Sequence, residues 1–227
     1  MLRKWDNLPR YMQTEAVSIY YESLRKKKAQ LVLKRSFDFI AATAMIIILF
    51  PIMLLISILI ITDSKGSIFF CQERITQYGR KFCIYKFRTM VVNAERIGAH
   101  VTAQYDNRVT KIGRILRKYR LDELPQLINI ILGDMSFCGT RPESTYFVKK
   151  YTPEMFATLL LPAGVTSEAS ILFKDEDELL GDISDLDQMY VEQILPKKME
   201  YNLESILHFS LIRDIKTMIR TILVIIR

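Results

Sequence analysis

Two adjacent carboxylates, Asp122 and Glu123, are the strongest candidates for chemistry in this sequence. They stand in the segment LDELPQ, directly after a basic stretch. A carboxylate can attack phosphorus and form an acyl phosphate. Arginines and a divalent cation can neutralise the charge on the phosphoryl oxygens. The pair therefore indicates phosphoryl transfer, with Asp122 and Glu123 as candidate catalytic and metal-binding residues. The alternative is a pair that only stabilises a helix start through the helix dipole.

The basic stretch before the pair carries a cation at every third position. These residues are Arg108, Lys111, Arg114, Arg117 and Arg120. Residues three apart on a helix share a face. The face can hold phosphates or anionic lipid head groups, or it can be an ordinary solvated surface. A net charge of +7 over 227 residues favours anionic partners in general.

Several other chemistries lack their sequence signatures. The chain has no GxxxxGK[ST] phosphate loop, no GxGxxG dinucleotide fingerprint and no GxSxG nucleophile motif. The two histidines, His100 and His208, lie far apart, which argues against a structural zinc site. The three cysteines, Cys71, Cys83 and Cys138, include no CxxC pair, so we expect no disulfide framework. The residues left for chemistry are carboxylates, lysines and arginines.

The elements that position the pair begin with an apolar segment. Phe39 to Ile61 contains 23 residues without a charge. At about 1.5 Å per residue, it can cross a bilayer core of about 30 Å. Pro51 lies in its middle, and proline breaks or bends a helix. Basic residues flank both ends, and positive charge prefers the cytoplasmic side. These features favour a re-entrant hairpin broken at Pro51; the alternative is a kinked transmembrane helix.

The remaining pattern predicts a helix from Glu15 to Lys28 and a small β-hairpin. Its strands are expected at Ser67–Gln72 and Lys81–Arg88, with a turn at Gln77–Arg80. The segment 203–227 is amphipathic, with apolar residues at helical spacing and basic residues opposite them. Such a helix can lie in a membrane interface or pack as an ordinary terminal helix.

The predicted fold is α+β, mostly helical and membrane-embedded. Its parts are a re-entrant N-terminal membrane helix hairpin, the small β-hairpin and interfacial amphipathic helices. Three regions follow along the chain: a basic N-terminal segment (1–35), the membrane helix (36–62) and a cytoplasmic catalytic domain with the amphipathic C-terminal helix (63–227).

An ordered set of short motifs resembles one known family. In chain order these are Lys34-Arg35 with Asp38, Pro51, Phe70-x-Gln72-Glu73-Arg74, Gly79, Lys86-Phe87-Arg88-Thr89-Met90, Gly113-Arg114 with Arg117, Leu121-Asp122-Glu123-Leu124-Pro125-Gln126, Gly133-Asp134-Met135-Ser136 and Gly139-Thr140-Arg141-Pro142-Glu143. The set resembles the bacterial sugar transferase family, the monotopic polyprenyl-phosphate phosphoglycosyl transferases. The resemblance runs from about residue 34 to the C-terminus.

The resemblance implies an activity. Such enzymes move a sugar 1-phosphate from a UDP-sugar to undecaprenyl phosphate, release UMP and need Mg²⁺. The family's catalytic dyad falls on Asp122 and Glu123, with Asp122 as the nucleophile and Glu123 supporting it or the metal. The family's basic positions fall on Lys86, Arg88 and Arg141, which are expected to bind phosphate. Arg114 and Arg117 of the basic stretch complete the expected phosphate-binding set.

The resemblance also implies a setting. The expected location is the bacterial inner membrane, with the catalytic domain on the cytoplasmic face. Expected partners are the UDP-sugar, undecaprenyl phosphate and membrane lipid, and also downstream glycosyltransferases and a second copy of the chain; nucleic acid is not expected. One departure is that the family's Arg-Pro-Gly run appears here as Leu161-Pro162-Ala163-Gly164. A non-catalytic relative that binds lipid or partners is the alternative function.

Overall fold

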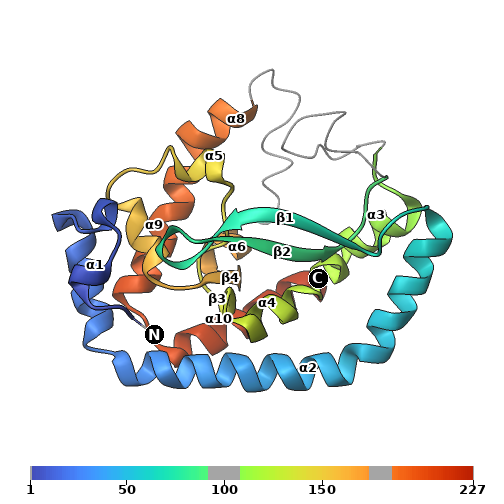
Figure 1. The fold of residues 1–227 in the computed structure, drawn as a ribbon, viewed down its shortest axis with the longest axis horizontal. Coiled ribbons are helices and arrows are strands. Elements are labelled where there is room, and N and C mark those ends of the chain that lie inside the picture. The colour runs from blue at the N-terminus through green and yellow to red at the C-terminus, as the bar shows by residue number, and fades with distance from the viewer. Residues whose placement is uncertain (1, 92–107, 174–185, 227) are drawn as a thin grey trace.

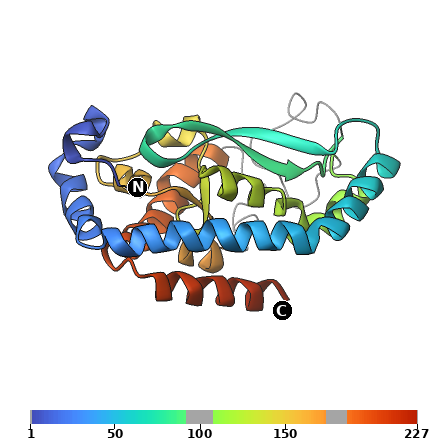
Figure 2. The same cartoon turned by 60° about the horizontal axis from the view of Figure 1, so that its bottom comes forward.

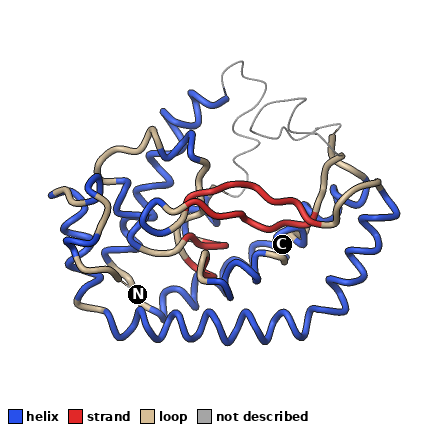
Figure 3. Tube along the Cα trace, viewed as in Figure 1, coloured by secondary structure: helices blue, strands red, loops and turns tan. Residues whose placement is uncertain are grey.

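The computed structural model describes residues 2–91, 108–173 and 186–226. Helices surround two small sheets, as the predicted α+β class requires (Figures 1 and 3). The α-helices are α1 (Glu15–Arg25), α2 (Lys28–Asp63), α3 (Lys111–Lys118), α4 (Gln126–Leu132), α5 (Thr145–Val148), α6 (Glu168–Leu172), α8 (Leu186–Met189), α9 (Leu195–Leu207) and α10 (Leu211–Ile226). Shorter helical turns are η1 (Trp5–Asn7), η2 (Arg10–Met12), η3 (Gln77–Gly79), η5 (Leu121–Glu123), η6 (Met155–Leu160) and the π-helical η7 (Tyr190–Ile194).

The apolar segment forms one continuous helix, α2, which begins at Lys28 rather than near residue 36. Pro51 lies inside this helix without interrupting it. Figure 1 shows the axis of α2 changing direction between its long first part and its shorter end part. A proline removes one backbone hydrogen bond and bends a helix. The predicted break at Pro51 is therefore corrected to a bend within a single helix.

Most of the apolar surface of α2 faces away from the protein. Ile47 and Ile48 are 70% and 72% exposed. Other exposed large apolar residues of α2 are Val32, Leu33, Phe39, Ile40, Met45, Phe50, Ile52, Leu54, Leu55, Ile58, Leu59 and Ile61. By length and composition the helix could cross a membrane. A contiguous exposed apolar surface of this kind is typical of a protein or lipid interaction site.

Charged side chains fasten the first part of α2 to the rest of the protein. Arg35 donates to the carbonyl oxygens of Ile130 and Ile131 at 2.6 and 2.8 Å, at the C-terminal end of α4. The Lys34 ammonium lies 2.6 Å from the Asp214 carboxylate of α10. Figure 2 shows α10 running beside this part of α2. The two helices are thus joined by a buried ion pair.

The C-terminal end of α2 is fastened to the same body. Asp63 accepts a hydrogen bond of 3.0 Å from the backbone N–H of Ile112, at the start of α3. The Arg88 guanidinium, just past β2, donates to the Ser64 and Lys65 carbonyl oxygens at 2.7 and 3.1 Å. Both ends of the apolar helix therefore meet one folded unit.

The predicted β-hairpin is confirmed. Strands β1 (Phe69–Ile75) and β2 (Lys81–Phe87) pair antiparallel around the turn η3. The structure also joins Cys71 to Cys83 by a disulfide across this hairpin, with Cα atoms 5.5 Å apart. This single pair is an exception to the expected absence of a disulfide framework. The strand register pairs Cys71 with Tyr85 and Cys83 with Glu73, so the two cysteines lie diagonally across the hairpin.

A second, parallel pair of strands was not predicted. β3 (Met135–Cys138) lies beside β4 (Ala163–Thr166). A Cβ atom at Gly164 would overlap the backbone of Gly139, so this close approach requires glycine. Four-residue strands without alternating polarity carry little sequence signal.

The two ends of the chain form helices where helices were expected. α1 begins at Glu15 as predicted and ends at Arg25, three residues early. Its buried residues Val17 and Leu24 pack with Met12 in a core cluster shared with η6 and α9. α10 confirms a C-terminal helix, but it begins at Leu211, and residues 203–207 of the expected segment belong to α9. The exposed apolar residues of α10 are Ile212, Ile219, Ile222 and Leu223.

Thr76 tests the junction between the two sheets. Thr76 is 1% exposed. Its hydroxyl donates to the Asp134 carbonyl at 2.6 Å and accepts from the Ala163 N–H at 3.1 Å. Thr76→Val keeps the shape and leaves both backbone groups unpaired, so we expect a loss of about 3 kcal/mol of stability. The melting temperature should fall by roughly 6–12 °C in a thermal denaturation series in detergent.

The matched control is Thr145→Val. Among the described residues, the Thr145 hydroxyl makes one exposed 3.5 Å contact, to Glu73. This change should therefore alter stability by less than about 0.5 kcal/mol. Equal melting temperatures for the two variants would contradict the role assigned to Thr76.

Candidate active site

The candidate carboxylates lie on a short turn between two helices. Arg120 has a left-handed backbone (φ 56°), which ends the basic helix α3 and redirects the chain into η5. Pro125 then precedes α4. In the described part of the chain, no backbone N–H of α4 donates to Asp122 or Glu123. The pair therefore makes no direct cap bond to α4, although it lies just before that helix, at the end where the helix dipole favours negative charge.

Glu123 gathers three cations on one oxygen atom. Its Oε1 lies 2.9 Å from Arg141, 3.3 Å from Lys86 and 3.8 Å from Arg120. Burial alone would raise the pKa of Glu123, but the Arg141 guanidinium and the Lys86 ammonium hold it well below its usual range. Glu123 therefore stays ionised and orients the cations around it.

Asp122 is in a different state. The residue is 7% exposed, and its buried Oδ1 atom has no hydrogen-bond partner within the described parts of the chain. Burial raises the pKa of Asp122, while the nearby Lys86 ammonium opposes this shift. A carboxylate oxygen that accepts no hydrogen bond keeps its lone pairs available for attack on an electrophile. The two adjacent carboxylates thus differ: Glu123 is paired with cations, and Asp122 has an oxygen that accepts no hydrogen bond from the described residues.

Three separate segments supply the cations. Lys86 comes from β2, Arg120 from the end of α3, and Arg141 from the loop after β3. Burial lowers the pKa of Lys86, although the Glu123 carboxylate acts in the opposite direction. A cation poorly solvated by water gains more from a bound phosphate than an exposed one does. The cluster can therefore receive phosphoryl oxygens.

The structure brings together only part of the predicted set. Lys86 and Arg141 contact Glu123 directly, and the charge of Arg117 acts on Asp122 while its Nε donates to Thr89 at 2.9 Å. Arg114 is exposed on α3.

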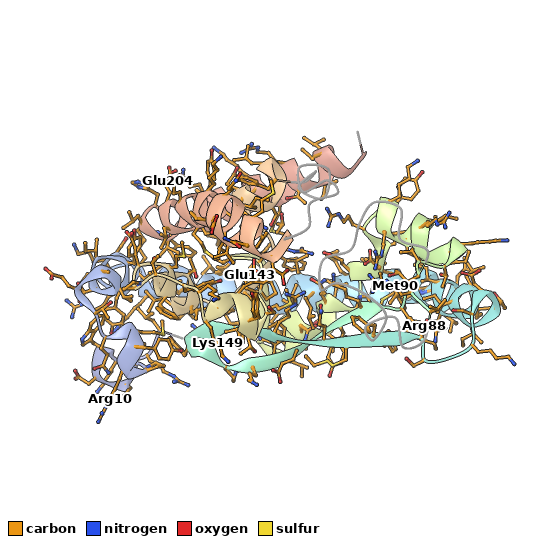
Figure 4. The ribbon with its side chains drawn as sticks, turned by 90° about the horizontal axis from the view of Figure 1, so that it is seen from above. Arg10, Arg88, Met90, Glu143, Lys149 and Glu204 are labelled. Atoms are coloured by element: carbon orange, nitrogen blue, oxygen red, sulfur yellow. A yellow bond between two sulfur atoms is a disulfide. The ribbon has the colours of Figure 1, made fainter. Side chains whose placement is uncertain are left out.

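Arg88 lies elsewhere. It is 7% exposed and is bonded to the end of α2. Figure 4 shows it toward the end of the molecule where α2 and α3 meet, apart from Glu143.

Sequence reasoning missed Asn129, which aligns the turn with the hairpin. Asn129 is fully buried; its amide donates to the Cys83 carbonyl at 2.7 Å and accepts from the Tyr85 N–H at 3.0 Å. These two bonds fix α4 against β2, directly beside Lys86. A polar residue at helical spacing after DELPQ, inside an apolar helix, is the signal that could have identified it. Arg120 was noted only as part of the basic stretch.

The loop that carries Arg141 is braced from behind. Two residues further on, Glu143 is buried, its carboxylate accepts from the Tyr190 hydroxyl at 2.5 Å, and its carbonyl accepts from the Ile75 N–H at 3.0 Å. Lys198 reaches the same hydroxyl at 3.3 Å. Figure 4 shows Glu143 near the centre of the molecule. This buried network holds the Arg141 loop against β1.

The site offers a modest set of magnesium ligands. The described residues contain no cluster of three or more His, Cys, Asp or Glu side chains suited to a metal. Mg²⁺ commonly uses one or two carboxylates and completes its shell with water and substrate phosphates. Asp122 Oδ1 is a carboxylate oxygen without a hydrogen-bond partner among the described residues, so it can serve as such a ligand. Glu123 Oε1 instead forms ion pairs with Lys86 and Arg141. The residues present therefore fit Mg²⁺ held mainly by Asp122 and substrate.

Comparison with known proteins places this arrangement in context. One relative, the UDP-N-acetylgalactosamine-undecaprenyl-phosphate N-acetylgalactosaminephosphotransferase of Aeromonas hydrophila, is 36% identical over 194 residues, 84% of this chain and 43% of the relative. The UDP-glucose:undecaprenyl-phosphate glucose-1-phosphate transferase of Escherichia coli is 32% identical over 84% of this chain and 39% of its own length. A putative undecaprenyl-phosphate N-acetylgalactosaminyl 1-phosphate transferase of Bacillus subtilis is 40% identical over 60% of this chain and 77% of its own length.

The chain thus spans less than half the length of the first and second of these relatives. The family described as bacterial sugar transferase matches residues 29–227, which include the apolar helix, the hairpin, the dyad and the Arg141 loop. On that match, this chain belongs to the bacterial sugar transferase family.

Proposed function

We propose that the protein transfers a sugar 1-phosphate from a UDP-sugar to undecaprenyl phosphate and releases UMP, as the first step in assembling a bacterial surface glycan. The observation that carries the proposal is the buried Asp122 carboxylate with an open Oδ1, beside a cluster of cations held by Glu123. The relatives' names support the two substrate classes, a UDP-sugar and undecaprenyl phosphate.

The proposed reaction has two displacements at one phosphorus atom. An oxygen of Asp122 attacks the β-phosphorus of the UDP-sugar, and the bond from that phosphorus to the bridging oxygen breaks. UMP leaves with the electron pair, and an aspartyl-phosphosugar remains. A phosphate oxygen of undecaprenyl phosphate then attacks the same phosphorus, the bond to Asp122 breaks, and the carboxylate is restored. The product is an undecaprenyl diphosphate sugar.

The neighbouring residues supply charge and order. Lys86 and Arg141 are placed to stabilise the negative charge on the phosphoryl oxygens, and Glu123 keeps these cations at the site in the absence of substrate. Mg²⁺, when bound at Asp122, would further neutralise the diphosphate and improve UMP as a leaving group. Burial raises the pKa of Asp122, whereas the Lys86 ammonium opposes this shift and favours the ionised carboxylate that attack on phosphorus requires.

The proposed setting is the cytoplasmic face of the bacterial inner membrane. Both ends of α2 are fastened to one body, so α2 would enter the lipid and return to the same face with its bend inside. The exposed apolar residues of α10 would lie in the lipid interface beside it. A lipid phosphate and a soluble nucleotide sugar would then meet at head-group height. Downstream glycosyltransferases and a second copy of the chain are proposed partners at this surface.

Asp122→Asn tests the reaction. Wild-type protein in detergent should release UMP when given undecaprenyl phosphate, Mg²⁺ and a suitable donor among UDP-N-acetylgalactosamine, UDP-glucose and UDP-galactose. The variant should lose at least about 10³-fold in kcat, because the amide is a poor nucleophile toward phosphorus. Chelation of Mg²⁺ should abolish the wild-type activity. Full activity in Asp122→Asn would remove the nucleophile from the proposal, and lipid-independent release would contradict the acceptor.

Arg141→Met and Arg88→Met separate phosphate binding from anchoring. We expect Arg141→Met to lower kcat/KM by about 10²-fold or more, because a charged donor to the diphosphate is lost. Arg88→Met should instead lower the melting temperature, because the carbonyl groups at the end of α2 lose their donors. A raised KM for the UDP-sugar in Arg88→Met at unchanged melting temperature would restore the sequence-based prediction that Arg88 binds phosphate.

Cysteine labelling tests the membrane arrangement. Single cysteines at Gln30 and Lys65, near the two ends of α2, are introduced into a chain whose native cysteines are replaced by serine. Both positions should react with a membrane-impermeant reagent from the same, cytoplasmic, side of the vesicle. Labelling from opposite sides would establish a full span and contradict the re-entrant arrangement.

A further inference from the structure

One buried side chain beside the dyad has no role in the proposed reaction. Gln126, in the first turn of α4, is 1% exposed, and neither its amide nitrogen nor its amide oxygen has a hydrogen-bond partner among the residues that the structure describes. A buried carboxamide left unpaired destabilises the folded protein, because its polar atoms lose their hydrogen bonds to water. Native proteins pair nearly all such groups, so an exception calls for a partner that binds there.

The position of Gln126 indicates where that partner lies. Residues 121–132 run helically from η5 into α4, so Asp122, Gln126 and Asn129 share one buried face. Asn129 on that face contacts the backbone of β2 at Cys83 and Tyr85. Gln126 therefore lies between the strand contact and the nucleophile, about one helical turn from each.

The Asp122 carboxylate and the Gln126 amide lie one helical turn apart on the same buried face. Like both polar atoms of the amide, Asp122 Oδ1 is buried and has no hydrogen-bond partner among the described residues. A substrate that reaches this oxygen must open the space around it, and residues one turn apart on a helix have Cβ atoms only about 5–6 Å apart. The chemical group that Asp122 attacks therefore comes within reach of the Gln126 side chain.

We propose that the Gln126 carboxamide binds the sugar phosphate during its transfer through Asp122. Its Nε2–H donates to a phosphoryl oxygen, and its Oε1 accepts from a hydroxyl of the attached sugar. A sugar phosphate supplies both an acceptor and a donor, so it satisfies both open atoms. The amide is neutral and adds a donor to the phosphoryl group without competing with the nucleophile for a proton. This inference rests on the proposed function.

The test combines stability with kinetics. Gln126→Met keeps the unbranched shape and removes both polar atoms. If the amide is unpaired in the resting protein, the variant should melt at the wild-type temperature or above it. With the donor that wild type uses, and with undecaprenyl phosphate, its kcat should fall by about 10²-fold, as for loss of a preorganised donor to a developing oxyanion. Gln126→Glu should lose more, because it adds negative charge beside the phosphoryl group.

Asn129→Leu is the matched control on the same helix face. It also replaces a buried amide by an apolar side chain of similar shape, but that amide has two backbone partners. Its melting temperature should therefore fall by about 5 °C or more.

A wild-type kcat in Gln126→Met, or a fall in its melting temperature, would overturn the proposal. The first outcome would leave the amide without a catalytic role, and the second would show that it is paired in the resting protein. Absence of lipid-dependent UMP release by the wild type would instead contradict the proposed function, so the two failures can be told apart.

Discussion

The rest of this structure depends on an apolar helix held at both ends by charged residues of one folded body. Lys34 and Arg35 fasten the beginning of α2 to α10 and α4, and Asp63 and Arg88 connect its end to α3 and β2. Between these contacts the helix exposes large apolar side chains. Since an exposed apolar surface is unfavourable in water, these anchors would determine which side of the body faces lipid in the proposed membrane arrangement. The dyad turn joins α3 to α4, and both of these helices contact α2. The site is therefore attached directly to the helix that would enter the membrane.

Within the site, the two adjacent carboxylates differ in their interactions because their surroundings differ. Three cations on Glu123 Oε1 hold one carboxylate ionised and occupied. Asp122 Oδ1 is buried and has no hydrogen-bond partner among the described residues. Environment alone can divide the roles of two carboxylates in this way. In the proposed reaction, the same division assigns the roles of nucleophile and magnesium ligand to Asp122 rather than to Glu123. It would also place the cations at the site before a diphosphate binds.

The sequence predicted elements with strong local signals. The apolar run, the hairpin and the DELPQ pair each combine composition with spacing. The apolar run is helical, but it starts earlier than expected and is not broken at Pro51. The hairpin forms, and the DELPQ pair lies on a turn before a helix. Arg88 shows the limit of a motif, since its position near Lys86 does not reveal that its side chain turns toward the end of α2. The β3–β4 pair depends on contact between residues far apart in the chain, and a four-residue strand has no usable period. Gln126 and Asn129 look alike in the sequence, and only the structure shows that one amide is paired and the other is open.

The central claim is that Asp122 carries the sugar phosphate. The most direct measurement is mass spectrometry of protein incubated with its UDP-sugar and Mg²⁺ in the absence of lipid acceptor, followed by rapid acid quench and peptide mapping. The account predicts one added sugar phosphate per chain, located on the peptide that contains Asp122 and discharged when undecaprenyl phosphate is added. An active protein whose adduct lies on another residue, or that forms no adduct at any time before lipid is added, would contradict the account.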